Sequence, residues 1–296
     1  MMNWMKFKFA ISATLVALLA GGAITAAISQ ENSGGGGPTA LKIAQQSQAA
    51  YAALSSYSDT GTATSTGAGA STKTTFDIRL QRPNFYRVEW SQGGGFYSSH
   101  GTVRSDGTGN YLSYTGANAP IKPQKMHNME IAIGSATGIS DSAAADIPGT
   151  FFNLGWGDQL GVIASGRSNV ERGNDEKIGE TDCYVLSYSI GPVKLPNNMG
   201  SSGTATTRLW IGKQDHLIRQ VETTSKGGTT HLKISDDDLK TILERAGKPT
   251  TAEAIADLRQ KIEQDQKAAQ TGTFVSIQTH ENISVNQKFS VTDFAD

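Results

Sequence analysis

The residues that could do acid–base or metal chemistry are few and widely scattered in this sequence. Its five histidines are His100, His127, His216, His231 and His280. None of them forms the His-x-x-x-His pair that would place two imidazoles on one face of a helix. We therefore expect solvated or structural histidines and predict no metal site.

The single cysteine, Cys183, is expected to be structural. It lies in the run 182–186, whose pattern is typical of a strand. A thiolate nucleophile would need a partner base and electropositive surroundings, so a buried strand residue is the better interpretation. One cysteine also excludes an internal disulfide and a multi-cysteine zinc site.

Two further motifs could suggest ligand binding. The acidic run 236–238 lacks the spacing and the glycine of an EF-hand, and acidic side chains favour the start of a helix. The glycines at 93–95 fit neither the Walker nor the dinucleotide pattern, and no Gly-x-Ser-x-Gly elbow is present. We predict no cofactor and no catalytic residue. The net charge of −1 argues against a nucleic-acid partner.

The elements that must position these residues are mainly short strands. Charged residues make up only 18% of the chain, and serine, threonine and glycine are abundant, which favours strands and turns. The connections are too short for parallel crossovers, so the pattern predicts an antiparallel meander. The predicted strands are 76–80, 85–90, 96–104, 110–114, 169–172, 176–178, 183–189, 208–212, 217–224, 229–234 and 274–280.

Apolar residues at helical spacing interrupt this meander. They predict an amphipathic helix over 39–56, a short helix after Met126, and another over 141–146 that stops before Pro148. Two more helices are predicted within 236–270, each with an apolar stripe that needs a surface to cover. We expect one domain over 39–296, with 236–270 as a helical insertion.

The N-terminus has the pattern of an export signal. Lys6 and Lys8 precede the uncharged run 9–29, which ends in small residues, as a secretory signal does. The run is also long enough to span a bilayer. It is therefore either a cleaved signal peptide or a retained membrane anchor, followed by a glycine-rich linker over 30–38. Both alternatives place the folded domain in the periplasm or cell envelope.

Several motifs resemble a known superfamily. Arg82-Pro83-Asn84 stands between two strands in the run 80–88, which resembles the strand–Arg-Pro-Asn–strand signature of the LolA/LolB superfamily of periplasmic lipoprotein carriers. The Asp106-Gly107 turn before an aromatic strand is similar to the next hairpin of that superfamily. The segments 178–186, 209–219 and 283–294 resemble its DUF2092 branch. Together the motifs span 39–234 and 273–294.

The resemblance implies a mainly β fold with α-helices. It is a strongly curved antiparallel sheet, an incomplete β-barrel, with helices covering its open mouth. It also implies an apolar cavity for acyl chains, and an arginine, here Arg82, that hydrogen-bonds to the helical lid. Tyr86, Val88, Trp90 and Trp210 are large strand residues that either line this cavity or fill an ordinary core.

Three functions follow as hypotheses. The first is a non-enzymatic envelope protein that binds a lipid or lipoprotein acyl chain. The second is a membrane-anchored sensor or interaction module with an envelope protein partner, which a retained anchor would favour. The third is a hydrolase of envelope material, which needs a nucleophile–base set that the sequence does not show. The insertion 236–270 does not belong to the classical carriers, and we expect it on or near the barrel mouth.

Overall fold

The structure is a computed structural model that describes residues 37–67, 70–93, 99–115, 120–155, 157–165, 169–191, 200–230, 235–245 and 249–295. The predicted signal or anchor over 1–29 lies outside the described residues, as does the linker except for Gly37 and Pro38. Those assignments stay predictions. Among the described residues, no helix combines the length and the apolar character needed to span a membrane.

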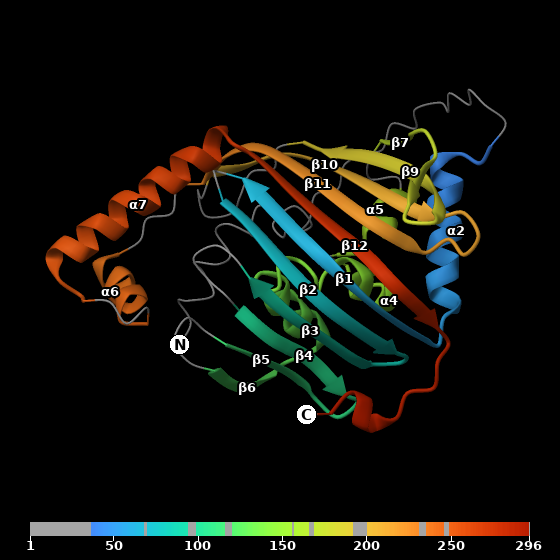
Figure 1. The fold of residues 1–296 in the computed structure, drawn as a ribbon, viewed down its shortest axis with the longest axis horizontal. Helices are drawn as coiled ribbons and strands as arrows, with labels where there is room; N and C mark the ends of the chain where they lie inside the picture. The colour runs from blue at the N-terminus through green and yellow to red at the C-terminus, as the bar shows by residue number, and fades with distance from the viewer. Residues whose placement is uncertain are drawn as a thin grey trace.

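Twelve strands form one antiparallel sheet (Figure 1). Its order is β6-β5-β4-β3-β2-β1-β12-β11-β10-β9-β7, with β8 paired to another part of β9. The two ends of this order do not pair, so the described part of the sheet is an open, curved barrel, as predicted. The strands are β1 (Ser56–Gly67), β2 (Ala70–Gln81), β3 (Phe85–Gly93), β4 (Ser99–Asp106), β5 (Asn110–Thr115), β6 (Pro120–Met126), β7 (Val170–Arg172), β8 (Glu176–Ile178), β9 (Thr181–Ile190), β10 (Gly200–Gly212), β11 (Ile218–Thr230) and β12 (Thr273–Val285).

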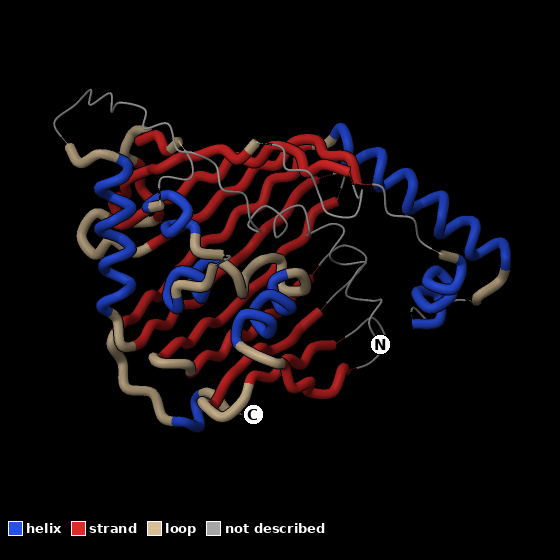
Figure 2. The backbone as a smooth tube through the Cα atoms, turned by 180° about the vertical axis from the view of Figure 1, so that it is seen from behind, coloured by secondary structure: helices blue, strands red, loops and turns tan. Residues whose placement is uncertain are grey.

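Four helices pack against the sheet. Three short ones, α3 (Met129–Thr137), α4 (Asp146–Phe152) and α5 (Gln159–Ala164), lie over one face, which we call the inner face (Figure 2). The longer α2 (Ala40–Ala53) crosses one end of the strands and contacts α4 and α5. Thr39 caps α2 by accepting a hydrogen bond from the backbone amide of Lys42.

Alternation along the strands sends large apolar side chains to the inner face. Leu80, Ile78 and Phe76 of β2 are almost fully buried there, and β3 contributes Tyr86 and Val88 in register with the first two. These residues belong to one large buried cluster that also contains side chains of α2 to α5. The hydrophobic effect therefore holds the helices on this face of the sheet.

The helical insertion comprises α6 (Asp236–Arg245) and α7 (Ala252–Thr271). It was expected on or near the mouth, but it extends away from the sheet at the end opposite α2 (Figures 1 and 2). The reason is that its apolar stripes cover each other: Leu239 and Leu243 of α6 pack with Ile255 and Ile262 of α7. Of the two described helices of the insertion, α7 is the one that makes extensive contact with the sheet, along β11.

Two predictions of local structure were wrong. The sequence predicts a helix over 39–56 and no strand before residue 76, but α2 ends at Ala53 and residues 56–67 form the long central strand β1. The helix expected over 141–146 is a series of turns, and α4 instead begins at Asp146 and includes Pro148. A proline is tolerated there because the first turn of a helix needs no intrahelical N–H donor.

Candidate functional site

The inner face of the sheet holds three of the five predicted site residues. Tyr86 and Val88 are fully buried on β3, and Trp90 follows them two residues further along the same face. The Tyr86 hydroxyl bonds to Asn110 Oδ1 at 2.8 Å, and its ring meets Phe152 edge-on. Aromatic and aliphatic groups of the sheet therefore face the helices directly.

Trp90 leans towards the neighbouring strand β4. Gly101 stands opposite it, and a Cβ at that glycine would lie only 2.4 Å from Cζ2 of the indole. A side chain at position 101 would therefore displace the ring. The buried Nε1 of Trp90 has no hydrogen-bond partner in the structure.

Trp210 does not join the other predicted site residues. It lies on the opposite, outer face, in a small apolar cluster with Cys183 and Val185. Its Nε1 donates to Glu176 at 2.8 Å, and the Arg208 guanidinium lies 4.5 Å from its ring centre. This cluster holds β8 and β9 against β10, and it is separate from the inner face.

Arg82 connects the sheet to two helices. It follows the end of β2, and although the residue is exposed, its guanidinium donates three hydrogen bonds to backbone carbonyls. The acceptors are Leu54 O at 3.0 Å and Tyr51 O at 3.3 Å, at the end of α2, and Phe151 O of α4 at 2.6 Å. The guanidinium also lies 4.6 Å from the Phe151 ring centre. One side chain therefore joins β2, α2 and α4.

A buried acid–imidazole pair, which sequence reasoning missed, lies on the inner face. Asp59 of β1 and His280 of β12 are joined by a 2.7 Å contact between Oδ2 and Nδ1, and both side chains are completely buried. The Tyr57 hydroxyl donates to the same Oδ2 at 2.6 Å. Burial raises the pKa of Tyr57 well above its ordinary value, so its hydroxyl keeps its proton.

A second buried carboxyl lies nearby at the start of α4. Asp146 accepts hydrogen bonds from Gln159 of α5 and from Gln278 of β12, each at 2.8 Å. Burial raises the pKa of Asp146, while the two amide hydrogen bonds and nearby His280 oppose that shift. Gln159 also bonds to the Tyr188 hydroxyl of β9. Polar groups thus run across the inner face from β1 to β9.

Cys183 matches its predicted structural role. It is fully buried, and desolvation raises the pKa of its thiol, which opposes thiolate formation. Across the residues that the structure describes, no group of three or more histidine, cysteine, aspartate or glutamate side chains could hold a metal ion. The acidic run 236–238 lies in the first turn of α6, as predicted, and the hydroxyl of Ser235 caps the helix.

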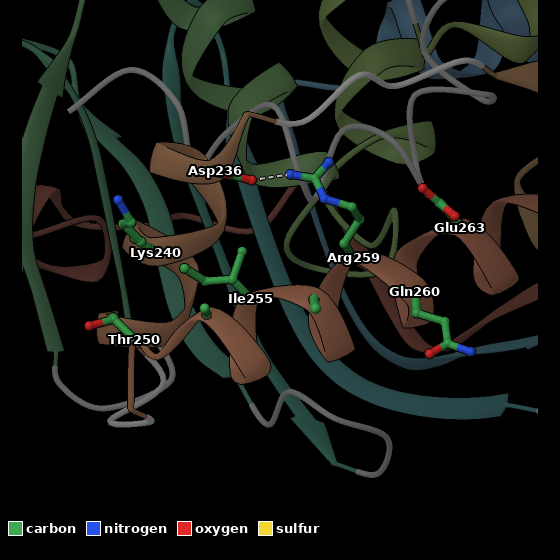
Figure 3. A pocket seen from close by; sticks show the side chains of 9 residues that line it. Asp236, Lys240, Thr250, Ile255, Arg259, Gln260 and Glu263 are labelled. Carbon is green, nitrogen blue, oxygen red and sulfur yellow. Dashed lines mark hydrogen bonds and ion pairs between the residues drawn. The ribbon is translucent and has the colours of Figure 1, made fainter.

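A pocket of about 520 Å³ lies on the insertion rather than on the inner face (Figure 3). Its wall carries charges of both signs: Arg259 pairs with Asp236, while Lys240 and Glu263 stand at other points of the rim. Ile255 contributes the apolar floor. The pocket has no buried polar group that lacks a partner, among the residues described, and we assign it no ligand.

Comparison with known proteins finds similarity in structure only. Neither a family model nor a curated protein sequence matches the chain. The lipoprotein LppX of Mycobacterium tuberculosis is 11% identical, with a TM-score of 0.40, over 85% of this chain and 97% of that one. LprF of Mycobacterium bovis is 12% identical, with a TM-score of 0.40, over 85% and 95% of the two chains. A LolA superfamily protein of Nitrosomonas europaea is 10% identical, with a TM-score of 0.29, over 88% and 99%.

These matches include a protein of the superfamily that the Arg-Pro-Asn motif resembles. The DUF2092 branch is not confirmed. At such identities the likeness concerns the fold alone, and we take nothing about ligand or partner from it.

Proposed function

We propose that this chain is a non-enzymatic envelope protein that binds a lipid or lipoprotein acyl chain between its inner face and its helical cover. The observation that carries the proposal is the Arg82 contact. A single charged side chain at the end of β2 contacts α2, which crosses the end of the strands, and α4, one of the helices that cover the apolar, aromatic face of the sheet. Such a contact can hold the cover closed and yet be broken without unfolding the sheet.

The inner face suits a hydrocarbon ligand. Its largest groups are apolar or aromatic, and removing an acyl chain from water onto such a surface is favourable by about 0.8 kcal/mol for each buried CH₂ group. The cover is built of short helices, α3 to α5, whose few turns can shift as a unit. A ligand would therefore enter by separating the helices from the sheet.

Export supports the same proposal. The positive flank and uncharged run over 1–29 would carry the domain to the periplasm or cell envelope, where acyl chains of lipids and lipoproteins are found. A cleaved signal would free the protein to move between membranes. A retained anchor would instead favour the second candidate, a fixed sensor or interaction module.

The α6–α7 insertion is the observation that favours this second candidate. It is a separate helical unit with its own apolar cluster, and it extends away from the sheet. An envelope protein partner could bind it without touching the inner face. We assign no catalytic step to the Asp59–His280 pair, because Nε2 of His280 has no hydrogen-bond partner within the described part of the chain.

The test is a titration of the full chain with N-phenyl-1-naphthylamine, an uncharged apolar dye that fluoresces when removed from water. We expect saturable binding of about one dye per chain and displacement by dodecane. Arg259→Ala, in the pocket of the insertion, is the matched control and should bind the dye equally. Absence of saturable binding by the wild type would overturn the proposal.

A further inference from the structure

Several buried polar atoms on the inner face have no hydrogen-bond partner among the residues that the structure describes. Around the small residue Ala63 of β1, they are Thr74 Oγ1, Gln278 Oε1, His280 Nε2 and Asp59 Oδ1. Thr74 and Gln278 flank Ala63 on the two neighbouring strands, and Asp59 and His280 lie further along β1 and β12. All four side chains are at most 3% exposed.

Partners nearly always satisfy buried polar atoms, and leaving one unpaired costs free energy. One such atom is an ordinary exception, but four on three adjacent strands form a site. Residues opposite each other on adjacent strands have Cβ atoms about 4.5–5.5 Å apart, and diagonal neighbours about 7–8 Å. A small polar group placed over Ala63 therefore lies nearest to Thr74 and Gln278. His280, which is opposite Gly61, is the diagonal neighbour, and Asp59 lies four residues from Ala63 along β1.

The hydrogen bonds already made decide which kind of group fits. Nδ1 of His280 faces the Asp59 carboxyl, so Nε2 is the ring nitrogen left for a ligand. Gln278 uses its NH₂ group on Asp146, so its remaining Oε1 is an acceptor. Asp59 Oδ1 is also an acceptor. The Thr74 hydroxyl and the ring nitrogen of His280 can donate or accept, so Gln278 Oε1 and Asp59 Oδ1 are the two atoms that need a donor.

We propose that the inner face holds the hydroxyl group of an uncharged amphiphile, with its O–H donated to this set of acceptors beside Ala63. The inference rests on the proposed function and names the chemistry of its ligand. An ester or an ether offers only acceptors and would leave the set unsatisfied. An anionic headgroup likewise offers only acceptor oxygens, which would face the acceptors Asp59 Oδ1 and Gln278 Oε1.

Two isomeric amphiphiles distinguish a ligand that can donate a hydrogen bond from one that can only accept. Dodecan-1-ol and 1-methoxyundecane have the same formula and nearly the same length, but only the alcohol has an O–H group. Each is used to displace N-phenyl-1-naphthylamine from the full chain. We expect the wild type to prefer the alcohol by about tenfold, the factor that 1.4 kcal/mol represents.

Two variants test whether that preference arises beside Ala63. Thr74→Val removes a hydroxyl that makes no hydrogen bond in the protein, so folding should be unaffected and the preference should fall severalfold. Gln278→Met removes an acceptor and should lower the preference further. Thr75→Val, the next residue on β2 but on the outer face, is the matched control and should keep the wild-type preference.

The outcomes are distinct. Equal displacement by the two isomers in the wild type would overturn the inference, since ordered water would then satisfy the acceptors. A preference that survives in both Thr74→Val and Gln278→Met would also overturn it, because the hydroxyl would bind elsewhere. Failure of the dye to bind at all would instead remove the proposed function.

Discussion

Replacement of Arg82 by leucine tests whether the helical cover opens. The variant loses three hydrogen bonds to the carbonyls of Leu54, Tyr51 and Phe151, and the contact with the Phe151 ring. A buried hydrogen bond from a charged donor contributes about 1.5–3 kcal/mol, but water replaces part of this at an exposed residue. We therefore expect the closed state to lose about 2 kcal/mol in total.

That loss corresponds to about a 30-fold shift in the equilibrium between closed and open cover. Amide hydrogen exchange measures it directly. Peptides that cover α2 and α4 should exchange faster by about that factor, while peptides from β9 to β11 should not change. The apolar dye should bind Arg82→Leu more tightly, because less free energy is spent on opening the cover.

Arg79→Leu is the matched control. Arg79 lies in β2, three residues before Arg82, and its guanidinium pairs with Asp77 of the same strand. Arg82→Lys should fall between wild type and leucine, since an ammonium cannot spread its donors over three carbonyls as a guanidinium does. If exchange and dye binding in Arg82→Leu match those of Arg79→Leu, Arg82 is only a turn residue and the closing role is refuted.

Four further expectations address other parts of the molecule. Cys183→Ser should keep the fold and dye binding, and the native thiol should react with a disulfide reagent far more slowly than in urea, because burial raises its pKa. Asp146 has a raised pKa, so the folded state holds its proton more tightly, and its contribution to stability falls as pH rises above about 4. The free energy of unfolding in urea should fall with rising pH more steeply for the wild type than for Asp146→Asn. An equal pH dependence of the two proteins would contradict the raised pKa. Replacing Asp236–Thr271 with a glycine-serine linker should leave the melting temperature of the sheet and dye binding nearly unchanged, and loss of cooperative melting would show that the insertion is part of the core. A reporter fused after Pro38 should be active only outside the cytoplasmic membrane, and cytoplasmic activity would exclude export.

The sequence predicts the meander where side chains of contrasting polarity alternate. Strands β2 and β3 are predictable because large apolar groups such as Ile78 and Val88 recur at every second position. Strand β1 escaped prediction because, after Tyr57, its inner positions are Asp59, Gly61 and Ala63, which include no large apolar side chain. Residues 56–67 form a strand because they pair with β2 on one side and β12 on the other, and this pairing is not visible in the sequence of the segment itself.

The site could be predicted only in part, for two different reasons. Arg82 was found through a local motif, and the structure places it against the helices as that motif implies. The Asp59–His280 contact joins residues 221 positions apart, so spacing in the sequence gives no sign of it. Trp210 could not be assigned to a face because both of its neighbours, Leu209 and Ile211, are also buried and apolar.

An open sheet also has two edge strands, and exposed edge strands can pair with those of other molecules. An unpaired strand offers its N–H and C=O groups to a strand of another molecule. At one edge of this sheet, β6 contains Pro120 and Pro123, which donate no hydrogen bond, and Lys122 and Lys125, which are exposed and repel their like. At the opposite edge stand two strands of three residues each, β7 and β8, which are too short to form a continuous row of hydrogen bonds with a strand of another molecule. The barrel can therefore stay open without joining its neighbours edge to edge.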